Sequence, residues 1–336
     1  MQASRLLIET LLHLLISMTI SNRFQSEYRY IFGPVVSRRL GMSLGVDLMP
    51  HKTCTLNCVY CECGKTTHLV KTRKEYVPIR EVIGELDVFL KNHPAIDYIT
   101  FSGSGEPTLH RRIQDIVDFL KTHYPSYPVA LLTNATLFYR PEVRRAVRDV
   151  DLIIASLDAG TPEVFRKVNR PHPGLDFTAI CEGLEILGRT RRHRLWIEFF
   201  IVPGVNDHPS ELAGIKSIVD RVGPDKIQLN VLDRPGTEEW VYPADTHILD
   251  RVRSYLARSE TIHRPVSDKT GRASEQTVAQ RIISTVRRRP STVSDLCQSL
   301  GSDQDTIWQH ICKLIDDGAI EERIMPRGTF YVIRET

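Results

Sequence analysis

The sequence predicts an α/β protein with a parallel sheet and a small, mainly helical domain after it. First, short apolar runs rich in β-branched residues alternate with stretches of helical periodicity from residue 42 to about residue 260. Second, these apolar runs are nearly continuous, which is typical of parallel strands buried on both faces. Third, the alternation stops at 261–274, where turn-forming residues accumulate.

Each predicted strand precedes a predicted helix. The strands are expected at 42–48, 96–102, 128–133, 151–156, 195–202 and 225–231. The helices are expected at 78–91, 110–122, 140–148, 175–188, 209–221 and 243–258. Six such units can form an open partial (β/α)6 barrel or a doubly wound sheet, and periodicity does not choose between them. Both architectures bind ligands at the carboxyl ends of their strands.

The chain length predicts more than one domain, because a single core seldom exceeds ~250–300 residues and this chain has 336. We expect an N-terminal extension over 1–27, a large α/β domain over 28–260, a linker over 261–274 and a second domain over 275–336. With 41% hydrophobic and 25% charged residues, the composition is that of an ordinary globular protein. The net charge of +3 is too small to indicate a nucleic-acid partner.

The first seventeen residues contain two short apolar runs, which Glu9 and His13 interrupt. This stretch is too short and too charged to span a bilayer, and it lacks a small-residue cleavage site. We expect a frayed amphipathic helix or an over-extended start, with Met18 as the true initiator; a weak signal peptide is the alternative. No membrane association is expected.

Four of the seven cysteines fall within residues 54–63, which is spacing for a metal site rather than for a disulfide framework. Free thiols indicate a reducing compartment, so we expect a cytoplasmic protein. Cys54, Cys58 and Cys61 can bind three irons of a [4Fe–4S] cluster and leave the fourth iron open to a ligand. A zinc site or unliganded thiols are the alternatives. Cys63 is either a fourth ligand or a bystander.

Polar residues gather where the predicted strands end. The segment Gly103-Ser104-Gly105-Glu106 follows the second strand, and Asn134 follows the third. Ser156 and Asp158 end the fourth strand, and Asn206 follows the fifth. Each of them also has a structural interpretation, as a tight turn for the glycines and as a helix cap for the others. Their repeated placement at one edge predicts a ligand site there.

The cysteine segment Cys54-Thr55-Leu56-Asn57-Cys58-Val59-Tyr60-Cys61 resembles the signature of the radical S-adenosylmethionine (SAM) superfamily. The segments 32–34, 37–41, 43–47 and 100–109 extend the similarity to the branch of the tRNA wyosine-forming synthases and their unassigned relatives. The resemblance covers about residues 28–240. It implies a partial (β/α)6 radical SAM barrel, with a [4Fe–4S] cluster on Cys54, Cys58 and Cys61 and SAM on the open iron.

The resemblance also implies SAM contacts at nine residues: Tyr60, Gly103, Ser104, Gly105, Glu106, Asn134, Ser156, Asp158 and Asn206. The Gly103–Glu106 motif corresponds to the family's site for the SAM amino group, and Tyr60 to a position near the adenine. Asn134, Ser156 and Asp158 are candidates for the ribose and the carboxylate. Asn206 is a candidate for the adenine or the ribose.

The implied activity is that of an oxidoreductase or transferase, in which a 5′-deoxyadenosyl radical derived from SAM abstracts hydrogen from a substrate. The implied electron donor is a flavodoxin or ferredoxin, and tRNA is the leading substrate. However, residues 1–53 contain no cysteine, whereas the wyosine synthases carry a second cysteine set there. Modification of a peptide or a small metabolite is therefore the second hypothesis.

Residues 275–336 predict helices at 275–288, 293–300 and 304–317, followed by a hairpin around Arg327-Gly328, which is a winged-helix pattern. Many winged helices bind DNA, so an iron–sulfur sensor that regulates transcription is an alternative function. However, Glu275 to Thr336 holds eight Lys/Arg against nine Asp/Glu, and a duplex-binding face needs a basic surface. We therefore expect the domain to dock a protein or a structured RNA.

Two arginine groups have both a functional and a structural interpretation. Arg38 and Arg39 precede the first predicted strand, where they can hold a carboxylate or a phosphate or can be ordinary surface charges. The run 287–289 ends the first helix of the small domain and can supply part of a basic surface.

Overall fold

The computed structural model describes residues 28–257, 259–262 and 278–334. The predicted N-terminal extension and most of the predicted linker lie outside these residues. Among the helices that are described, none has the length and apolar character needed to cross a membrane.

The large domain is built on an eight-stranded sheet in which all neighbours are parallel except the first pair, β1 and β2. In spatial order its strands are β1 (Ile31–Ser37), β2 (Gly41–Val46), β5 (Tyr98–Phe101), β6 (Val129–Thr133), β7 (Leu152–Ser156), β8 (Arg194–Phe200), β9 (Lys226–Asn230) and β10 (Ser259–Thr261). The six strands predicted from the sequence are β2 and β5 to β9. The edge strands β1 and β10 were not predicted.

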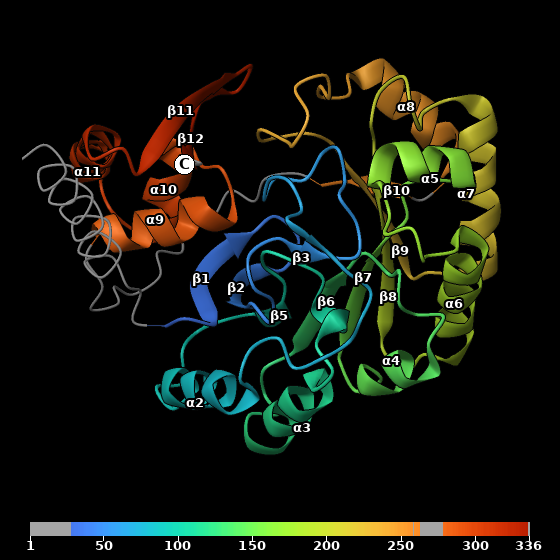
Figure 1. The fold of residues 1–336 in the computed structure, drawn as a ribbon, viewed down its shortest axis with the longest axis horizontal. Helices are drawn as coiled ribbons and strands as arrows, with labels where there is room; N and C mark the ends of the chain where they lie inside the picture. The colour runs from blue at the N-terminus through green and yellow to red at the C-terminus, as the bar shows by residue number, and fades with distance from the viewer. Residues whose placement is uncertain (1–27, 258, 263–277, 335–336) are drawn as a thin grey trace, which may run out of the picture.

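Helices cover the outer face of this sheet (Figure 1). They are α2 (Ile79–Leu90), α3 (Ile113–His123), α4 (Pro141–Ala146), α6 (Phe177–Thr190), α7 (Pro209–Val222) and α8 (Thr246–Tyr255). Each of the six β/α units places its strand directly beside the preceding one. Because the strand order never reverses, the doubly wound alternative is wrong. A sheet wound in one direction keeps its crossover helices on one face, since these connections are right-handed.

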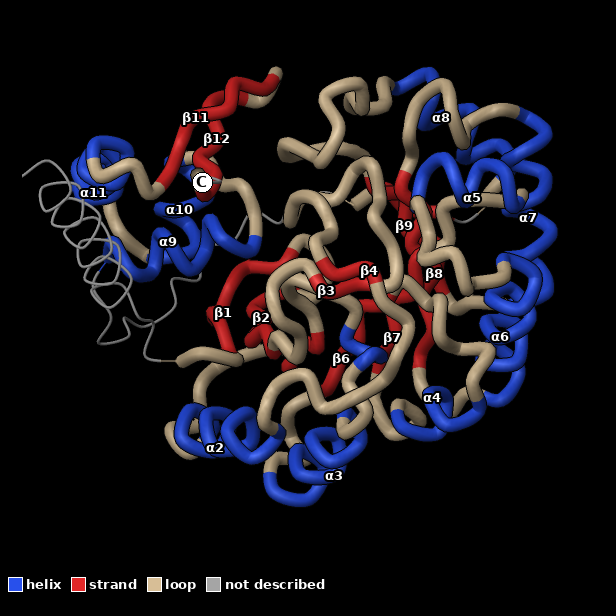
Figure 2. Tube along the Cα trace, in the orientation of Figure 1, coloured by secondary structure: helices blue, strands red, loops and turns tan. Residues whose placement is uncertain are grey.

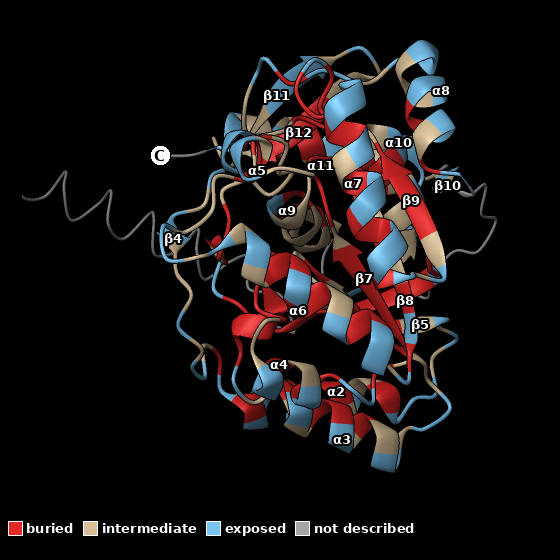
Figure 3. Ribbon diagram, turned by 90° about the vertical axis from the view of Figure 1, so that its right-hand side faces the viewer, coloured by how far each residue is buried: buried red, intermediate tan, exposed pale blue. Residues whose placement is uncertain are grey.

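The two faces of the sheet have different chemistry. On β2, Leu44 and Val46 are fully buried in the main core beneath the helices, whereas Ser43 and Gly45 line a cavity on the opposite face. Figure 3 shows that the strands of the sheet are mostly buried, whereas the helices carry many exposed residues. The inner face is covered by loops and by a short parallel pair, β3 (Thr53–Cys54) and β4 (His68–Leu69) (Figure 2).

The second domain has the predicted order of elements. It consists of α9 (Val278–Arg288), α10 (Val293–Leu300) and α11 (Gln304–Asp316), followed by the antiparallel strands β11 (Ile320–Met325) and β12 (Gly328–Ile333). A core of its own includes Ile282, Leu296, Ile307 and Tyr331. Helix α10 begins with a capping box formed by Thr292 and Asp295. The winged-helix assignment stays a prediction.

Ion pairs join the second domain to the loop after β9. Arg234 lies 3.0 Å from Asp295, and both side chains are 5% exposed. Arg327, at the turn of the hairpin, pairs with both Asp233 and Asp295. The second domain therefore sits against the β1 edge of the sheet, as Figure 1 shows.

Candidate active site

The cysteine loop follows β3 at the carboxyl edge of the sheet. It is anchored by main-chain hydrogen bonds to the end of helix α5 (Pro162–Asn169), whose start near Thr161-Pro162 the capping interpretation of Ser156 and Asp158 had assumed. The Asn57 N–H donates to the Asn169 carbonyl at 3.0 Å, and the Val59 N–H donates to the Val168 carbonyl at 2.9 Å. Thr161 caps this helix through its side chain, which accepts from the Val164 N–H at 3.3 Å.

Each of the three predicted ligand sulfurs has one side-chain N–H donor. Asn134 Nδ2 lies 3.4 Å from Cys54 Sγ, and Asn169 Nδ2 lies 3.4 Å from Cys58 Sγ. Lys52 Nζ lies 3.1 Å from Cys61 Sγ. A thiolate that binds iron is negatively charged, so donors of this kind suit cluster ligands and tune their electronic properties. The loop thus fits a [4Fe–4S] cluster.

Cys63 has different surroundings. Its thiol donates to the Arg288 carbonyl at 3.1 Å and lies 3.7 Å from the Gly103 carbonyl. A hydrogen bond with Cys63 lowers the pKa of Cys61 to about 5, whereas the same bond and burial hold the pKa of Cys63 well above its usual value. The role of Cys63, as a fourth ligand or a bystander, stays a prediction.

The other two ligand candidates, Cys54 and Cys58, are half-buried free thiols. Burial raises the pKa of Cys54 to about 12 and holds the pKa of Cys58 well above its usual value. Within the described ranges, no three His, Cys, Asp or Glu side chains are grouped closely enough to hold a single metal ion. Ligands of a [4Fe–4S] cluster bind different iron atoms and need not be grouped in this way.

The Gly103–Glu106 motif packs directly against the ends of β2 and β3. Gly103 has φ +132°, and a Cβ there would lie 2.3 Å from Asp47 Cγ. A Cβ on Gly105 would lie 2.1 Å from the Thr53 carbonyl oxygen. Asp47 then accepts hydrogen bonds from Ser104, at 3.1 Å from its N–H and 2.7 Å from its hydroxyl. Close approach therefore requires glycine at both positions, and at Gly103 the positive φ requires it as well.

Glu106 connects this motif to the next strand end. Its carboxylate accepts from the hydroxyls of Thr108 at 2.6 Å and Thr133 at 2.7 Å, and from the Asn134 N–H at 2.8 Å. Burial raises the pKa of this carboxyl. Since the carboxylate is 2% exposed and has several internal donors, its position favours a structural role, in which it fixes Asn134 beside Cys54.

Asp158 is a second buried carboxylate that connects several segments through hydrogen bonds. It accepts from the Tyr60 hydroxyl at 2.5 Å, from Asn169 Nδ2 at 2.7 Å and from the Phe200 N–H at 2.9 Å. The Tyr60 ring stacks on Phe200 with centroids 3.8 Å apart. Burial raises the pKa of Asp158 to about 6. This carboxylate holds the Asn169 amide where it reaches Cys58.

Asn206 and Ser156 differ in accessibility. Asn206 is fully buried; its amide donates to the carbonyls of Asp158 at 2.9 Å and Phe200 at 2.8 Å, and accepts from the Val202 N–H at 2.8 Å. These bonds favour the turn interpretation of Asn206. Ser156 is half-buried at the end of β7, and no described residue forms a hydrogen bond with its hydroxyl. The predicted SAM contacts of both residues stay predictions.

Sequence reasoning missed Lys52 and Asn169, although each contacts a ligand sulfur. Lys52 is 4% exposed and adjoins the cysteine loop, but a lone lysine in a loop is typical of a surface charge. Asn169 ends an eight-residue helix that the periodicity did not indicate. The only sequence feature that could have pointed to Asn169 was a side-chain amide near Asp158.

The family model of the radical SAM superfamily matches residues 48–213, which include the cysteine loop, the Gly103–Glu106 motif and Asp158. The matched segment is thus that of the radical SAM superfamily, and its cofactors are a [4Fe–4S] cluster and SAM. A UPF0026 protein of Methanocaldococcus jannaschii is 32% identical over 228 residues, which are 66% of this chain and 69% of the relative. The chain belongs to the UPF0026 family.

Two further comparisons differ in coverage. A protein of Brachyspira hyodysenteriae named GTPase Obg is 34% identical over 306 residues, 90% of this chain but 45% of that protein. The chain therefore spans less than half the length of that relative. A solved radical SAM methyltransferase of Sphaerobacter thermophilus superposes with a TM-score of 0.49 at 16% identity, over 65% of this chain and 66% of that structure.

Proposed function

We propose that this chain is a radical SAM oxidoreductase or transferase that holds its cluster through Cys54, Cys58 and Cys61. When bound, the reduced cluster and SAM supply a 5′-deoxyadenosyl radical and methionine, and the radical takes a hydrogen atom from the substrate. The observation that carries the proposal is the set of three N–H donors from Lys52, Asn134 and Asn169, one for each ligand sulfur.

The chain's own residues then divide into direct contacts and supports. Gly103 to Gly105 offer main chain at the carboxyl edge for the SAM amino group, and Ser156 offers a hydroxyl with no partner among the described residues. By resemblance Tyr60 lies near the adenine. Glu106, Asp158 and Asn206 have a supporting role in this proposal. Their side chains form hydrogen bonds within the protein and hold the neighbouring residues in place.

For the substrate we propose tRNA, on the resemblance to the wyosine-forming branch, with a peptide or a small metabolite as the alternative. The second domain would dock that substrate as a winged helix. Its balance of eight basic and nine acidic residues over Glu275 to Thr336 disfavours DNA. A flavodoxin or ferredoxin would supply the electron in the cytoplasm, where the seven free cysteines stay reduced.

The test is anaerobic reconstitution with iron and sulfide, reduction with dithionite, addition of SAM and mass spectrometry of 5′-deoxyadenosine. We expect product from the wild type and from Cys63→Ala, and neither cluster nor product from Cys58→Ala. The two variants are matched, because each removes one thiol from the same loop. Retention of the cluster in Cys58→Ala would refute the ligand assignment.

The sensor hypothesis makes the opposite forecast for the same preparation. A transcriptional sensor binds a defined DNA site and needs no SAM cleavage, so a formed cluster that yields no 5′-deoxyadenosine with any candidate substrate would favour it. Metal analysis separates both hypotheses from a zinc protein, because zinc would replace iron and sulfide in the purified chain.

A further inference from the structure

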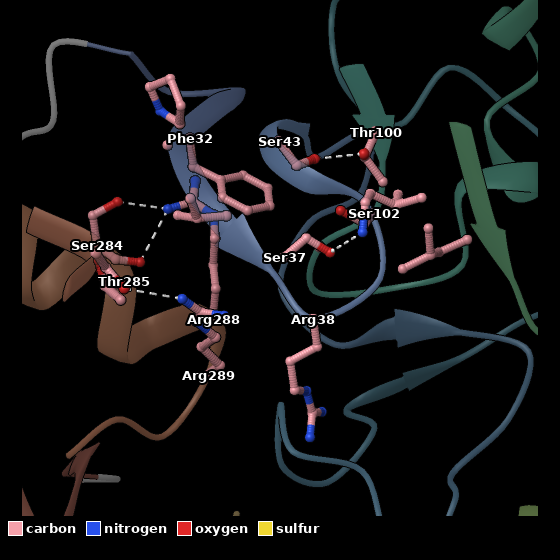
Figure 4. A pocket seen from close by; sticks show the side chains of 18 of the residues that line it. Phe32, Ser37, Arg38, Ser43, Thr100, Ser102, Ser284, Thr285, Arg288 and Arg289 are labelled. Carbon is pink, nitrogen blue, oxygen red and sulfur yellow. Dashed lines mark hydrogen bonds between the residues drawn. The ribbon is translucent and has the colours of Figure 1, made fainter. Parts of the chain in front are cut away.

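A cavity of about 260 Å³ lies between the inner face of the sheet and the second domain. Ser43 and Thr100 lie on its sheet side, and Arg288, the last residue of α9, and Arg289, which follows it, line the opposite side (Figure 4). The cavity also touches Gly103, the first residue of the predicted SAM motif. A molecule bound there would adjoin the proposed SAM site.

Arginines dominate the lining. Six of them face the cavity, with Glu62 as the one carboxylate among its described lining residues: Arg38, Arg39, Arg234, Arg281, Arg288 and Arg289. Three of the six have ionic partners. Arg39 pairs with Glu198, Arg38 lies 3.3 Å from Asp233, and Arg234 lies 3.0 Å from Asp295.

The remaining three, Arg281, Arg288 and Arg289, form no salt bridge with any described residue. Arg281 donates to the Leu300 carbonyl at 2.8 Å, and Arg289 donates to the Ser299 hydroxyl at 3.2 Å. The carboxylates nearest to them are engaged elsewhere, because Asp47 accepts from Ser104 and Asp295 pairs with Arg234 and Arg327. The cavity therefore holds a surplus of positive charge.

Two N–H groups of the lining have no acceptor. The Nε atoms of Arg39 and Arg288 are buried and form no hydrogen bond with any described residue. An unsatisfied buried donor is uncommon in folded proteins and suits a bound partner such as an anion. Burial and the neighbouring Arg234 lower the pKa of Arg289 to about 10, which still leaves it charged at neutral pH.

Arg288 is held in place from the large domain. Its guanidinium lies 4.4 Å from the centroid of the Phe32 ring, a cation–π distance. That ring fills the space beside Gly45, where a Cβ would lie 2.0 Å from Phe32 Cζ. The Arg288 carbonyl also accepts from the Cys63 thiol at 3.1 Å. The cysteine loop and β1 thus fix the arginine, so little reorganisation is needed to bind a ligand.

We propose that this cavity binds a phosphate group of the substrate through Arg281, Arg288 and Arg289. The proposal rests on the proposed function and names its substrate class, a phosphorylated compound. Guanidinium forks match the oxygens of phosphate in both monoesters and diesters, and a monoester, with a charge of about −2, offsets more of the surplus than a carboxylate would. The volume is near the lower limit of ~300–1,000 Å³ for ligand pockets, so the cavity admits a group of about nucleotide size.

Calorimetry on the reconstituted full chain, saturated with SAM, tests the site with inorganic phosphate, uridine 5′-monophosphate and uridine. We expect the monophosphate to bind at least about 10-fold more tightly than uridine. Arg288→Gln and Arg289→Gln should each weaken the monophosphate about 10-fold or more. Arg287→Gln is the matched control, since Arg287 is exposed on the same helix end and lies outside this cavity.

Three outcomes would overturn the proposal: no binding of either phosphate compound to the wild type, equal binding of uridine and its monophosphate, or unchanged binding in both arginine variants. Arg281→Gln is a third variant, for use if Arg288→Gln or Arg289→Gln fails to fold. It removes a charged side chain whose one hydrogen bond among the described residues is to the Leu300 carbonyl, and it should also weaken binding of the monophosphate. The assay needs no SAM cleavage. A failure of the phosphate proposal can therefore be told apart from a failure of the proposed function, because phosphate binding and 5′-deoxyadenosine formation are measured independently.

The same assay separates two sources of the phosphate. If it belongs to a nucleotide of RNA, unfractionated tRNA displaces the monophosphate from the wild type, and tRNA binding falls in Arg289→Gln. If it belongs to a small phosphate ester, tRNA leaves the monophosphate bound. Either result supports a phosphate site, and the first also supports a tRNA substrate.

Discussion

Single side chains decide how the cysteine loop is set for a cluster. The side-chain amides of Asn134 and Asn169 each reach one ligand sulfur. Glu106 holds the main-chain N–H of Asn134, and Asp158 holds the side-chain amide of Asn169. The ligand cysteines could be predicted from their spacing in the sequence. Their donors could not, because an amide beside a sulfur leaves no periodic or compositional pattern. Only the fold brings Asn134 within reach of Cys54.

The contact of Asn134 with Cys54 predicts a change in redox potential. An N–H donor stabilises the more negative, reduced cluster, so Asn134→Ala should lower the reduction potential. A difference of about 0.5–1.4 kcal/mol between the two redox states corresponds to about 20–60 mV for one electron. Spectroelectrochemical titration of the reconstituted protein measures it. Asn57→Ala is the control, since Asn57 lies in the same loop and its Oδ1 accepts from the Thr66 N–H instead.

At the scale of elements, the sequence predicted the six central strands and their helices because apolar runs and helical periodicity alternate regularly along this part of the chain. The misses have a common cause, which is shortness or an edge position. Strands β3 and β4 have two residues each. Strand β1 contains Gly33-Pro34 and a register shift between Phe32 and Val35. Such features weaken an alternating pattern.

One short element, the 3-10 turn at Pro107–Leu109 after the SAM motif, predicts a pH dependence through His110. This buried imidazole bonds the Val77 carbonyl at 3.0 Å through Nε2, and its Nδ1 accepts from the Arg112 N–H at 3.3 Å. Burial lowers the pKa of His110, so the folded chain keeps it neutral. The unfolded chain binds the extra proton, and stability should therefore fall as the pH drops below about 6.5.

Urea unfolding of the wild type and of His110→Gln between pH 5 and pH 7.5 checks this expectation. The part of the pH dependence due to His110 should reach at most about 1.4 kcal/mol per pH unit, and the variant should lack it. His123→Gln serves as the control, since this exposed ring ends α3. Equal pH dependence in the wild type and His110→Gln would contradict the assignment.

For the whole molecule, the sequence could not choose between two sheet architectures, because strand order is absent from periodicity. The sequence also did not predict which residues form ion pairs between the two domains. Asp233 and Arg234 follow the last central strand, while their partners Asp295 and Arg327 lie in the second domain. These contacts bridge residues 61 or more positions apart and close the arginine-lined cavity. The position of the second domain thus determines both the interface and the proposed substrate site.

The buried pair Arg234–Asp295 should make the two domains unfold together. Removing one partner leaves the other charge buried and unpaired, so Asp295→Ala should destabilise the chain by about 3–5 kcal/mol. Glu321→Ala is the matched control, because Glu321 pairs with Arg323 on the exposed hairpin, where a salt bridge is worth about 0–1 kcal/mol. Differential scanning calorimetry should show one transition for the wild type and the control, and an earlier separate transition for the second domain in Asp295→Ala. A single transition in that variant at the wild-type temperature would mean that the pair does not couple the domains.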